Sequence, residues 1–285
     1  MRVLISGASG LVGTELRKQF AALGHETVAL GRSEKLTGDQ MSEFDAVVNL
    51  AGATTGKIPW TKKYKDELIS SRLETTRNIV DAINAAKKKP KVLVSGSASG
   101  FYGDTGTEAA TEETSKGTGF LSDLAAKWEA IAKEANTRVV LVRTTMVMSR
   151  QLGALGKLLP LIKLGIGGPL GSGKQWWAWI SLRDEARAII HLIENAKAQG
   201  AYNLTAPQHA TCTEIVRGLG KALGRPTILQ VPSFAMRLLI GEAADELLLC
   251  NQKMTADKLL ETGFKFEHPT LQSAIDYVVG KNPAE

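Results

Sequence analysis

Residues 2–13 read RVLISGASGLVG and decide the fold. The first five, Arg2 to Ser6, form a short apolar run typical of a buried β-strand, and helical periodicity begins at Leu11. Between and just beyond these points stand Gly7, Gly10 and Gly13. Where Cβ atoms are missing, backbone amides can approach a diphosphate at the positive end of a helix. The stretch therefore predicts a strand, a phosphate-binding turn and a helix, which is the start of a dinucleotide-binding fold.

Short β-rich runs and longer helical segments alternate through the first half of the chain, which predicts a parallel α/β sheet. We expect strands at 2–6, 26–30, 45–50, 91–96 and 138–144, and helices at 11–23, 62–86 and 120–135. After Arg150 the chain becomes rich in glycine, and a smaller layer begins. The expected fold is a Rossmann-type, doubly wound parallel sheet with a smaller, mostly helical C-terminal lobe.

The domain boundaries follow from this change in composition after Arg150. The cofactor-binding core is placed at residues 1–150, completed by parts of 176–210, and the substrate-side lobe at 151–285. Within the second half we expect an aromatic strand at 176–180, a helix capped by Asp184 and running to Asn195, a strand at 202–204, and helices at 213–223, 232–249 and 271–279.

Composition limits the possible classes of protein. The 285 residues are 44% hydrophobic and 22% charged, as in an ordinary globular protein. Because no apolar run reaches 18 residues, we expect a cytoplasmic protein without a membrane partner. The two cysteines, Cys212 and Cys250, are too few for a disulfide framework and are expected to be reduced and buried.

The formal net charge of +6 raises the question of a polyanionic partner. Lysines gather at both ends of the helix expected at 62–86, without the interleaved aromatic residues of a nucleic-acid surface. We therefore expect no nucleic-acid partner. The four histidines show no metal-ligand spacing, and no metal site is expected.

The end of the second strand points to the type of dinucleotide. An Asp or Glu at this position accepts hydrogen bonds from the ribose of NAD, whereas the 2′-phosphate of NADP requires a cation. The chain has Gly31 and then Arg32 here. Arg32 favours NADP, the alternative being an ordinary surface arginine.

Several motifs resemble the extended short-chain dehydrogenase/reductases, the NAD-dependent epimerase/dehydratase group. They are Gly7 to Gly13, Asn49-Leu50-Ala51-Gly52 and Ser95-Gly96-Ser97. Others resemble one atypical epimerase-like branch that ends in a domain of unknown function, expected here at 233–281: Ser71 to Thr76, Lys127-Trp128-Glu129, Gly167 to Gly173 and Leu259 to Phe264. The resemblance implies a cofactor site made of Gly7, Ser9, Gly10, Leu11, Val12, Gly13, Gly31, Arg32, Leu50, Ala51, Gly52, Glu67, Arg72, Lys127 and Val147.

The related enzymes place a Tyr four residues before a Lys, so that both side chains share one helical face. There the Lys binds the nicotinamide ribose and lowers the pKa of the Tyr, which relays a proton. Lys127 fits the lysine, but Asp123 stands where the tyrosine is expected. A neighbouring cation lowers the pKa of Asp123, which leaves it as a base, a ribose contact or half of a surface ion pair.

Two further residues are candidates for catalysis, Ser97 by resemblance and Tyr102 by its position. Ser97 fits the family's serine, the alternative being a strand-end hydroxyl bonded to backbone. Tyr102 follows on the loop above the strand ends and could supply a displaced proton relay. Among the cofactor residues, Arg72 stands where relatives have asparagine, and Val147 either touches the nicotinamide end or packs in the core.

Two functions therefore stay open. The first is an NADP-dependent oxidoreductase or epimerase-like enzyme acting on an unidentified small molecule, with Ser97, Lys127, Tyr102 and Asp123 as candidate catalytic residues. The second is an NADP(H)-binding sensor or regulator that acts through a partner, which the missing tyrosine favours. The resemblance also implies a possible homodimer formed by two long helices on one face of the sheet.

Overall fold

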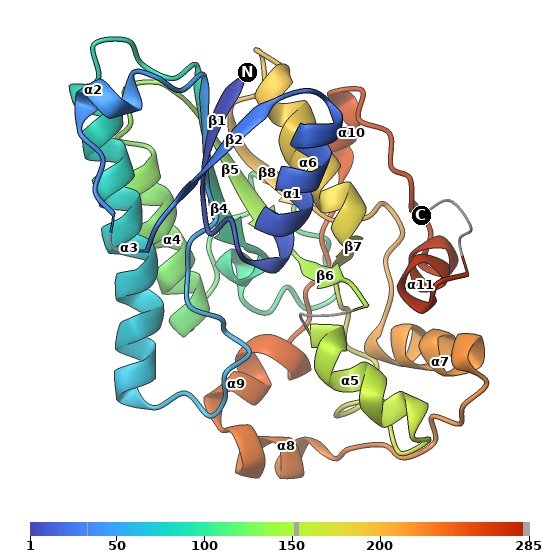
Figure 1. Ribbon diagram of the computed structural model, residues 1–285. Coiled ribbons are helices and arrows are strands. Elements are labelled where there is room, and N and C mark those ends of the chain that lie inside the picture. The colour runs from blue at the N-terminus through green and yellow to red at the C-terminus, as the bar shows by residue number, and fades with distance from the viewer. Residues whose placement is uncertain (33, 151–153, 282–285) are drawn as a thin grey trace.

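A parallel sheet of six strands occupies the centre of the molecule (Figure 1). The computed structural model describes residues 1–32, 34–150 and 154–281. All pairings in this sheet are parallel, and its order is β2-β1-β3-β4-β5-β8. The Rossmann-type sheet expected from the sequence is confirmed. Its strands are β1 (Arg2–Ser6), β2 (Glu26–Leu30), β3 (Ala46–Asn49), β4 (Val92–Ala98), β5 (Arg138–Thr144) and β8 (Gly200–Leu204).

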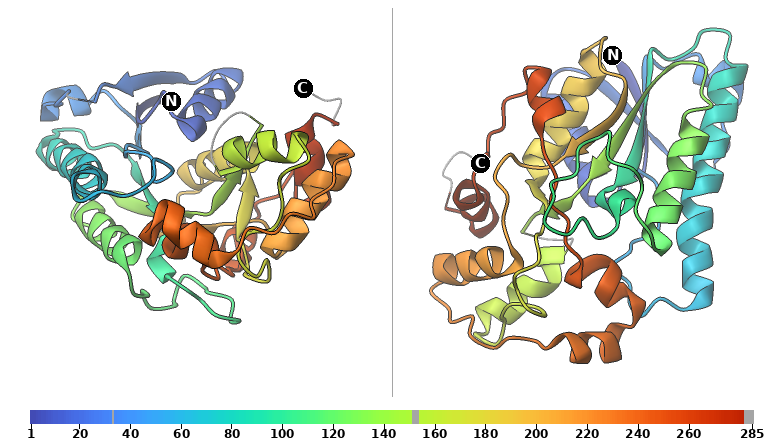
Figure 2. Two further views of the ribbon diagram at one scale, coloured as in Figure 1. Left: turned by 90° about the horizontal axis from the view of Figure 1, so that it is seen from below. Right: turned by 180° about the vertical axis from the view of Figure 1, so that it is seen from behind.

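Helices cover both faces of the sheet because its strands are apolar on both sides. Val3 and Ile5 share a buried cluster with α1 (Leu11–Ala22) and α6 (Leu182–Glu194). Leu4, which points the other way, packs with α3 (Lys62–Ala85) and α4 (Phe120–Ala132). Figures 1 and 2 show these two helical layers on either side of the strands.

The order of the strands reverses direction at β1. The chain passes from β1 outward to β2, returns to β3 on the other side of β1, and continues to β4 and β5. Open α/β sheets bind ligands at the carboxyl ends of the strands beside such a switch point. We call the two segments that meet there, residues 7–13 after β1 and 50–53 after β3, the switch-point edge.

Smaller elements follow the core and build the C-terminal lobe (Figure 1). A second buried cluster joins three of its helices, α5, α7 and α11, to a two-stranded sheet. The sheet consists of β6 (Met146–Met148) and β7 (Trp179–Ser181), and the helices are α5 (Ala154–Lys163), α7 (Cys212–Leu223), α8 (Ser233–Ile240), α9 (Glu242–Ala244), α10 (Asp257–Glu261) and α11 (Leu271–Val279). The remaining elements are α2 (Gly38–Met41), the 3-10 helix η1 (Ser99–Tyr102) and the π-helix η2 (Asp245–Leu249).

The lobe also corrects several expectations. The helix expected at 232–249 breaks at Gly241, whose φ of 60° and ψ of −141° do not continue a helix. Ser181, not Asp184, caps α6, because its hydroxyl accepts the Asp184 N–H. The aromatic strand begins only at Trp179, since Trp176 and Trp177 make isolated bridges. Helix α5 was not expected at all, because Gly156 and Pro160 weaken the helical pattern.

Both cysteines are free and buried, as expected, and burial raises the pKa of Cys212 to about 11 and that of Cys250 to about 12. Within the described ranges, no helix combines the length and the apolar character needed to cross a bilayer.

Candidate functional site

The glycine turn after β1 is packed at backbone contact distance. Gly7 has a φ of 73°, which favours glycine, and a Cβ there would lie 2.7 Å from the carbonyl carbon of Leu50. A Cβ on Gly13 would lie 2.3 Å from the carbonyl oxygen of Gly7. Real Cβ atoms do not come so close, and therefore both positions require glycine.

Helix α1 begins at this turn with its first amides unclaimed by side chains. Gly10 is the N-cap residue and makes no side-chain cap, and no acidic residue lies in the first turn. The N–H groups of Leu11, Val12 and Gly13 are thus the positive end of a twelve-residue helix beside a turn with exposed Ser9 and Gly10. Such an end binds phosphate groups.

The second wall of the switch-point edge is the segment after β3. The Leu50 N–H donates to the carbonyl oxygen of Ser6, and the Ala53 N–H donates to the Ser71 hydroxyl at 2.9 Å. Leu50 and Ala51 are half-buried, while Gly52 is exposed. These bonds hold the backbone of residues 50–53 opposite the glycine turn.

A buried chain of hydrogen bonds supports this wall from below. The Ser6 hydroxyl donates to the Asn49 side chain at 2.5 Å, and Asn49 donates to Thr76 at 2.8 Å. The Trp128 indole donates to the same Thr76 oxygen at 2.8 Å. This chain therefore ties β1 and β3 to α3 and α4 just beneath the site.

Arg72 packs directly against the same segment. Its guanidinium donates to the carbonyl oxygens of Ala53 and Leu68 and lies 5.4 Å from the Trp128 ring centre. A Cβ on Gly52 would lie 2.8 Å from the Arg72 Cζ atom, so a larger residue at this position would displace the Arg72 guanidinium. Burial lowers the pKa of Arg72 to about 10. Glu67, one turn earlier on α3, is exposed.

The end of β2 carries an unforeseen carboxylate. Gly31 and Arg32 are both exposed, in keeping with contact to a ligand or to solvent. The Gly31 N–H donates to the Glu34 carboxylate at 3.0 Å. The negatively charged Glu34 side chain therefore already accepts a backbone N–H group at the place where the 2′-phosphate is expected.

Val147, on β6, is half-buried and packs against two of the core clusters. It pairs with Ile180 on β7. The structure thus supports a packing role for Val147 and leaves its predicted contact with the nicotinamide as a prediction.

Ser97 and Tyr102 meet in a buried polar network beneath the sheet edge. The Ser97 hydroxyl donates to Glu129 at 2.7 Å. Arg143 donates to both oxygens of the Glu129 carboxylate, at 2.8 and 3.0 Å, and to the Tyr102 hydroxyl at 2.7 Å. The Tyr102 hydroxyl in turn donates to Asn203 at 2.7 Å.

This network has a structural explanation. Glu129 and Arg143 are 1% and 4% exposed, so each compensates the buried charge of the other. Burial raises the pKa of Tyr102 to about 12, the opposite of what a proton relay at neutral pH needs. With 3% exposure, the Tyr102 side chain is enclosed by its partners.

Asp123 and Lys127 lie elsewhere, on the exposed face of α4. Asp123 forms an ion pair with Lys116 at 2.7 Å. Lys116 lowers the pKa of Asp123 most strongly and Lys127 adds a smaller effect, in the direction expected from the sequence. The main partner of Asp123 is thus Lys116, instead of the lysine four residues away. The four predicted catalytic residues do not converge on one point.

From the sequence, Glu129 had no predicted role beyond its place in a motif, and Arg143 was not singled out. A charged residue within the apolar strand 138–144 was the available signal, because a buried arginine requires a carboxylate. Glu185 was also missed. It is fully buried on α6, accepts a hydrogen bond from Thr144 at 2.6 Å, and keeps one oxygen without a partner in the described structure. Burial raises its pKa to about 8.

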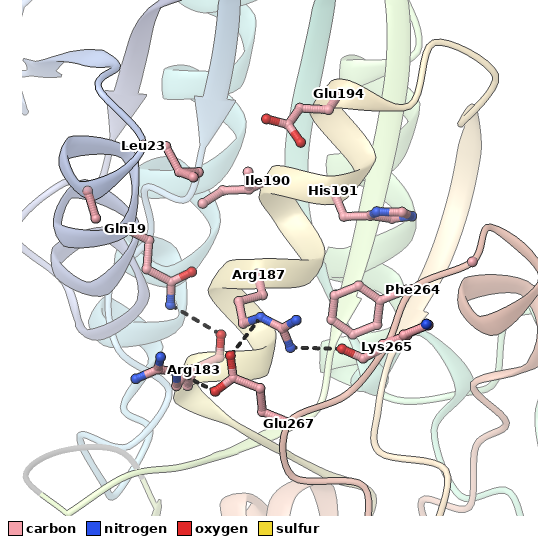
Figure 3. A pocket seen from close by; sticks show the side chains of 12 residues that line it. Gln19, Leu23, Arg183, Arg187, Ile190, His191, Glu194, Phe264, Lys265 and Glu267 are labelled. Carbon is pink, nitrogen blue, oxygen red and sulfur yellow. Dashed lines mark hydrogen bonds and ion pairs between the residues drawn. The ribbon is translucent and has the colours of Figure 1, made fainter. Parts of the chain in front are cut away.

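A pocket of about 470 Å³ is lined by Gln19 and Leu23, at the end of α1 opposite to the glycine turn. Figure 3 shows the side chains that line it. Arg183 and Arg187 line it, and both form ion pairs with Glu267, at 2.5 and 3.1 Å. Their charges are therefore used to fasten the segment before α11 to α6. The pocket contains none of the predicted site residues.

Comparisons with known protein families cover nearly the whole chain. The model of the NAD dependent epimerase/dehydratase family matches residues 3–205. A domain of unknown function, DUF1731, matches residues 231–278. An epimerase family protein of Mycobacterium leprae is 36% identical over 292 residues, which cover 96% of this chain and 94% of that protein.

Solved structures show the same likeness. The crystal structure of human epimerase family protein SDR39U1 (isoform 2) with NADPH superposes with a TM-score of 0.93 at 34% identity, covering 99% of this chain and 100% of that one. A nucleoside-diphosphate sugar epimerase from Corynebacterium glutamicum gives a TM-score of 0.76 at 27% identity, covering 99% of this chain and 58% of that one.

Proposed function

Because this chain belongs to the NAD dependent epimerase/dehydratase family, we propose that it binds NADP(H) at the switch-point edge and exchanges hydride with a small-molecule substrate. The proposal rests on the α1 N-terminus, which has no side-chain cap and lies at a turn where Gly7 and Gly13 leave no room for a Cβ. These amides lack a hydrogen-bond acceptor, which an anionic diphosphate would supply.

The residues available fit such a cofactor. The amides of residues 11–13 would hold the diphosphate, and the segment 50–53 would face it across the switch-point edge. Arg32 is exposed at the end of β2, where it would pair with the 2′-phosphate. When bound, the nicotinamide supplies or accepts hydride. The NADPH complex of the human relative supports this choice of cofactor.

A second function rests on a separate observation. Ser97 and Tyr102 are held inside a buried network, while Asp123 and Lys127 face outward. This arrangement favours an NADP(H)-binding regulator that responds to the cofactor and acts through a partner. Both proposed functions keep three expectations from the sequence. These are a cytoplasmic location, a possible homodimer and no nucleic-acid partner.

Titration with NADPH and NADH, followed by tryptophan fluorescence and melting temperature, tests the cofactor. Arg32→Glu is expected to weaken NADPH binding at least tenfold, by about 1.4 kcal/mol or more, and to leave NADH binding nearly unchanged. Glu34→Gln removes a negative charge from the same turn and is expected to strengthen NADPH binding by about two- to fivefold. An unchanged preference in Arg32→Glu would refute the assignment of the 2′-phosphate.

A screen for NADPH oxidation with carbonyl compounds and nucleotide sugars separates the two functions. Turnover with any substrate supports the enzyme. Tight binding of NADPH without turnover across the screen supports the regulator.

A further inference from the structure

One end of the molecule carries most of the large apolar side chains that are exposed in the described part of the chain. Of the eleven large apolar residues that are exposed in the described ranges, eight lie on α5, on α8 or in the segments next to them. Leu164 is 72% exposed, Ile228 83% and Leu238 84%. We call this set the apolar basal face: Leu161, Leu164, Ile166, Ile228, Leu229, Phe234, Leu238 and Leu239.

The segments that carry this face are adjacent in space. A Cβ on Gly165 would lie 3.7 Å from the Pro226 ring. The Gly171 N–H donates to the Val231 carbonyl oxygen at 2.8 Å, and the Val231 N–H donates to Pro169 at 3.0 Å. The chain after α5 thus runs beside residues 226–231, which lead directly into α8. Figure 1 shows α5 and α8 at the same end of the molecule, and the right-hand view of Figure 2 agrees.

Exposed cations border the apolar basal face. Lys163 lies in the last turn of α5, between Leu161 and Leu164, and Arg225 directly precedes the segment 226–231. The sequence has no acidic residue between Arg150 and Asp184. The acids after α8 already have partners: Glu242 pairs with Lys65, Asp245 pairs with Arg237, and Glu246 accepts the N–H groups of Phe120 and Leu121 at the start of α4. The positive charges of Lys163 and Arg225 therefore remain to attract anions at the border of the face.

We propose that the apolar basal face docks on the surface of an anionic lipid bilayer. Leucine, isoleucine and phenylalanine side chains enter the boundary between headgroups and acyl chains, while lysine and arginine contact lipid phosphate. A second copy of this chain fits less well. A symmetric dimer through this face would bring Lys163 and Arg225 of both copies together, and like charges repel.

The proposal is independent of cofactor binding, and it replaces the expectation that the protein has no membrane partner. The sequence concealed the face because its residues come from three short segments, none of which could span a bilayer. The docking is peripheral, with the helices lying at the membrane surface.

Sedimentation with vesicles tests the proposal. The wild-type protein is expected to bind phosphatidylcholine vesicles that contain phosphatidylserine at least about tenfold more tightly than vesicles of pure phosphatidylcholine, and to be released by salt. The double variant Phe234→Ser with Leu238→Ser is expected to lose at least about tenfold in binding. Lys163→Glu with Arg225→Glu should abolish the preference for phosphatidylserine.

Leu23→Ser is the matched control, because Leu23 is also an exposed leucine but lies at the C-terminal end of α1, as its C-cap residue. It should bind vesicles like the wild type, and all variants should keep the wild-type melting temperature. Failure of the wild type to bind anionic vesicles would overturn the proposal, as would equal binding by the double variant. A dimer by analytical ultracentrifugation that Leu238→Ser converts to a monomer would assign the face to a second copy instead.

Discussion

The switch-point edge and the end of β4 differ in what they are made of. At the switch-point edge the groups that face a ligand are backbone amides, held by glycines whose Cβ positions are already filled. At the end of β4, Ser97 and Tyr102 are side chains turned into a buried ion pair. A site built from backbone keeps its function wherever the turn forms, whereas a site built from side chains depends on which way each one faces.

The largest effect is expected from filling the glycine turn. Gly13→Ala would place a Cβ 2.3 Å from the Gly7 carbonyl oxygen, so the turn must open and its amides lose their common direction. We expect NADPH affinity to fall at least about 100-fold, as measured by calorimetric titration.

Gly56→Ala is the control for this change, because a Cβ there would have its nearest neighbour, the Thr54 hydroxyl oxygen, at 3.4 Å. It should bind NADPH like the wild type. A folded Gly13→Ala protein with unchanged affinity would contradict the role of the turn.

The second effect separates the two regions. Glu129→Gln leaves the buried Arg143 without a counter-charge, and we expect a loss of about 3 to 5 kcal/mol in the free energy of unfolding by urea. NADPH affinity should change by less than about twofold while the protein stays folded. Glu134→Gln, on the exposed surface, should alter neither quantity appreciably. A stable Glu129→Gln protein that fails to bind NADPH would mean that the network belongs to the cofactor site.

Glu185 predicts how stability depends on pH. Burial raises its pKa from 4.5 to about 8, so between these values the folded protein holds a proton that the unfolded chain has released. The free energy of unfolding therefore falls as pH rises through this window. Glu185→Gln lacks this loss and should be more stable than the wild type above about pH 8, by about 2 to 4 kcal/mol. Urea unfolding at about pH 5 and pH 8.5 measures the difference, and identical slopes for both proteins would contradict the account.

The smallest effect is expected on the outer face of α4. Asp123→Asn and Lys127→Met should each change NADPH affinity by less than about twofold, because both side chains face solvent. A tenfold loss in Lys127→Met would restore its predicted contact with the ribose.

Much of the fold could be predicted because its signals are local. Strands β1, β2 and β5 have the predicted bounds, and the glycine turn needs only the residues beside it. The family resemblance is confirmed by the match over residues 3–205. Helix 232–249 was wrong because a single glycine, Gly241, can either stay in a helix or break it.

The directions of the side chains were harder to predict from the sequence, although some of them could be inferred. Leu93 packs toward α3 and α4, and Ser97, four residues along the same strand, must face the same way. Leu121, Leu124 and Trp128 follow the spacing of a buried helical stripe, which leaves Asp123 and Lys127 outside. The partners of Ser97 could not be predicted, because Glu129 and Arg143 meet only through the packing of α4 on the sheet.

Calorimetric titration of the wild-type protein with NADPH is the most direct measurement of the central claim, that the switch-point edge holds NADP(H). We expect about one site per chain, and at least about tenfold weaker binding of NADH. The absence of binding heat, together with an unchanged melting temperature at saturating NADPH, would contradict it.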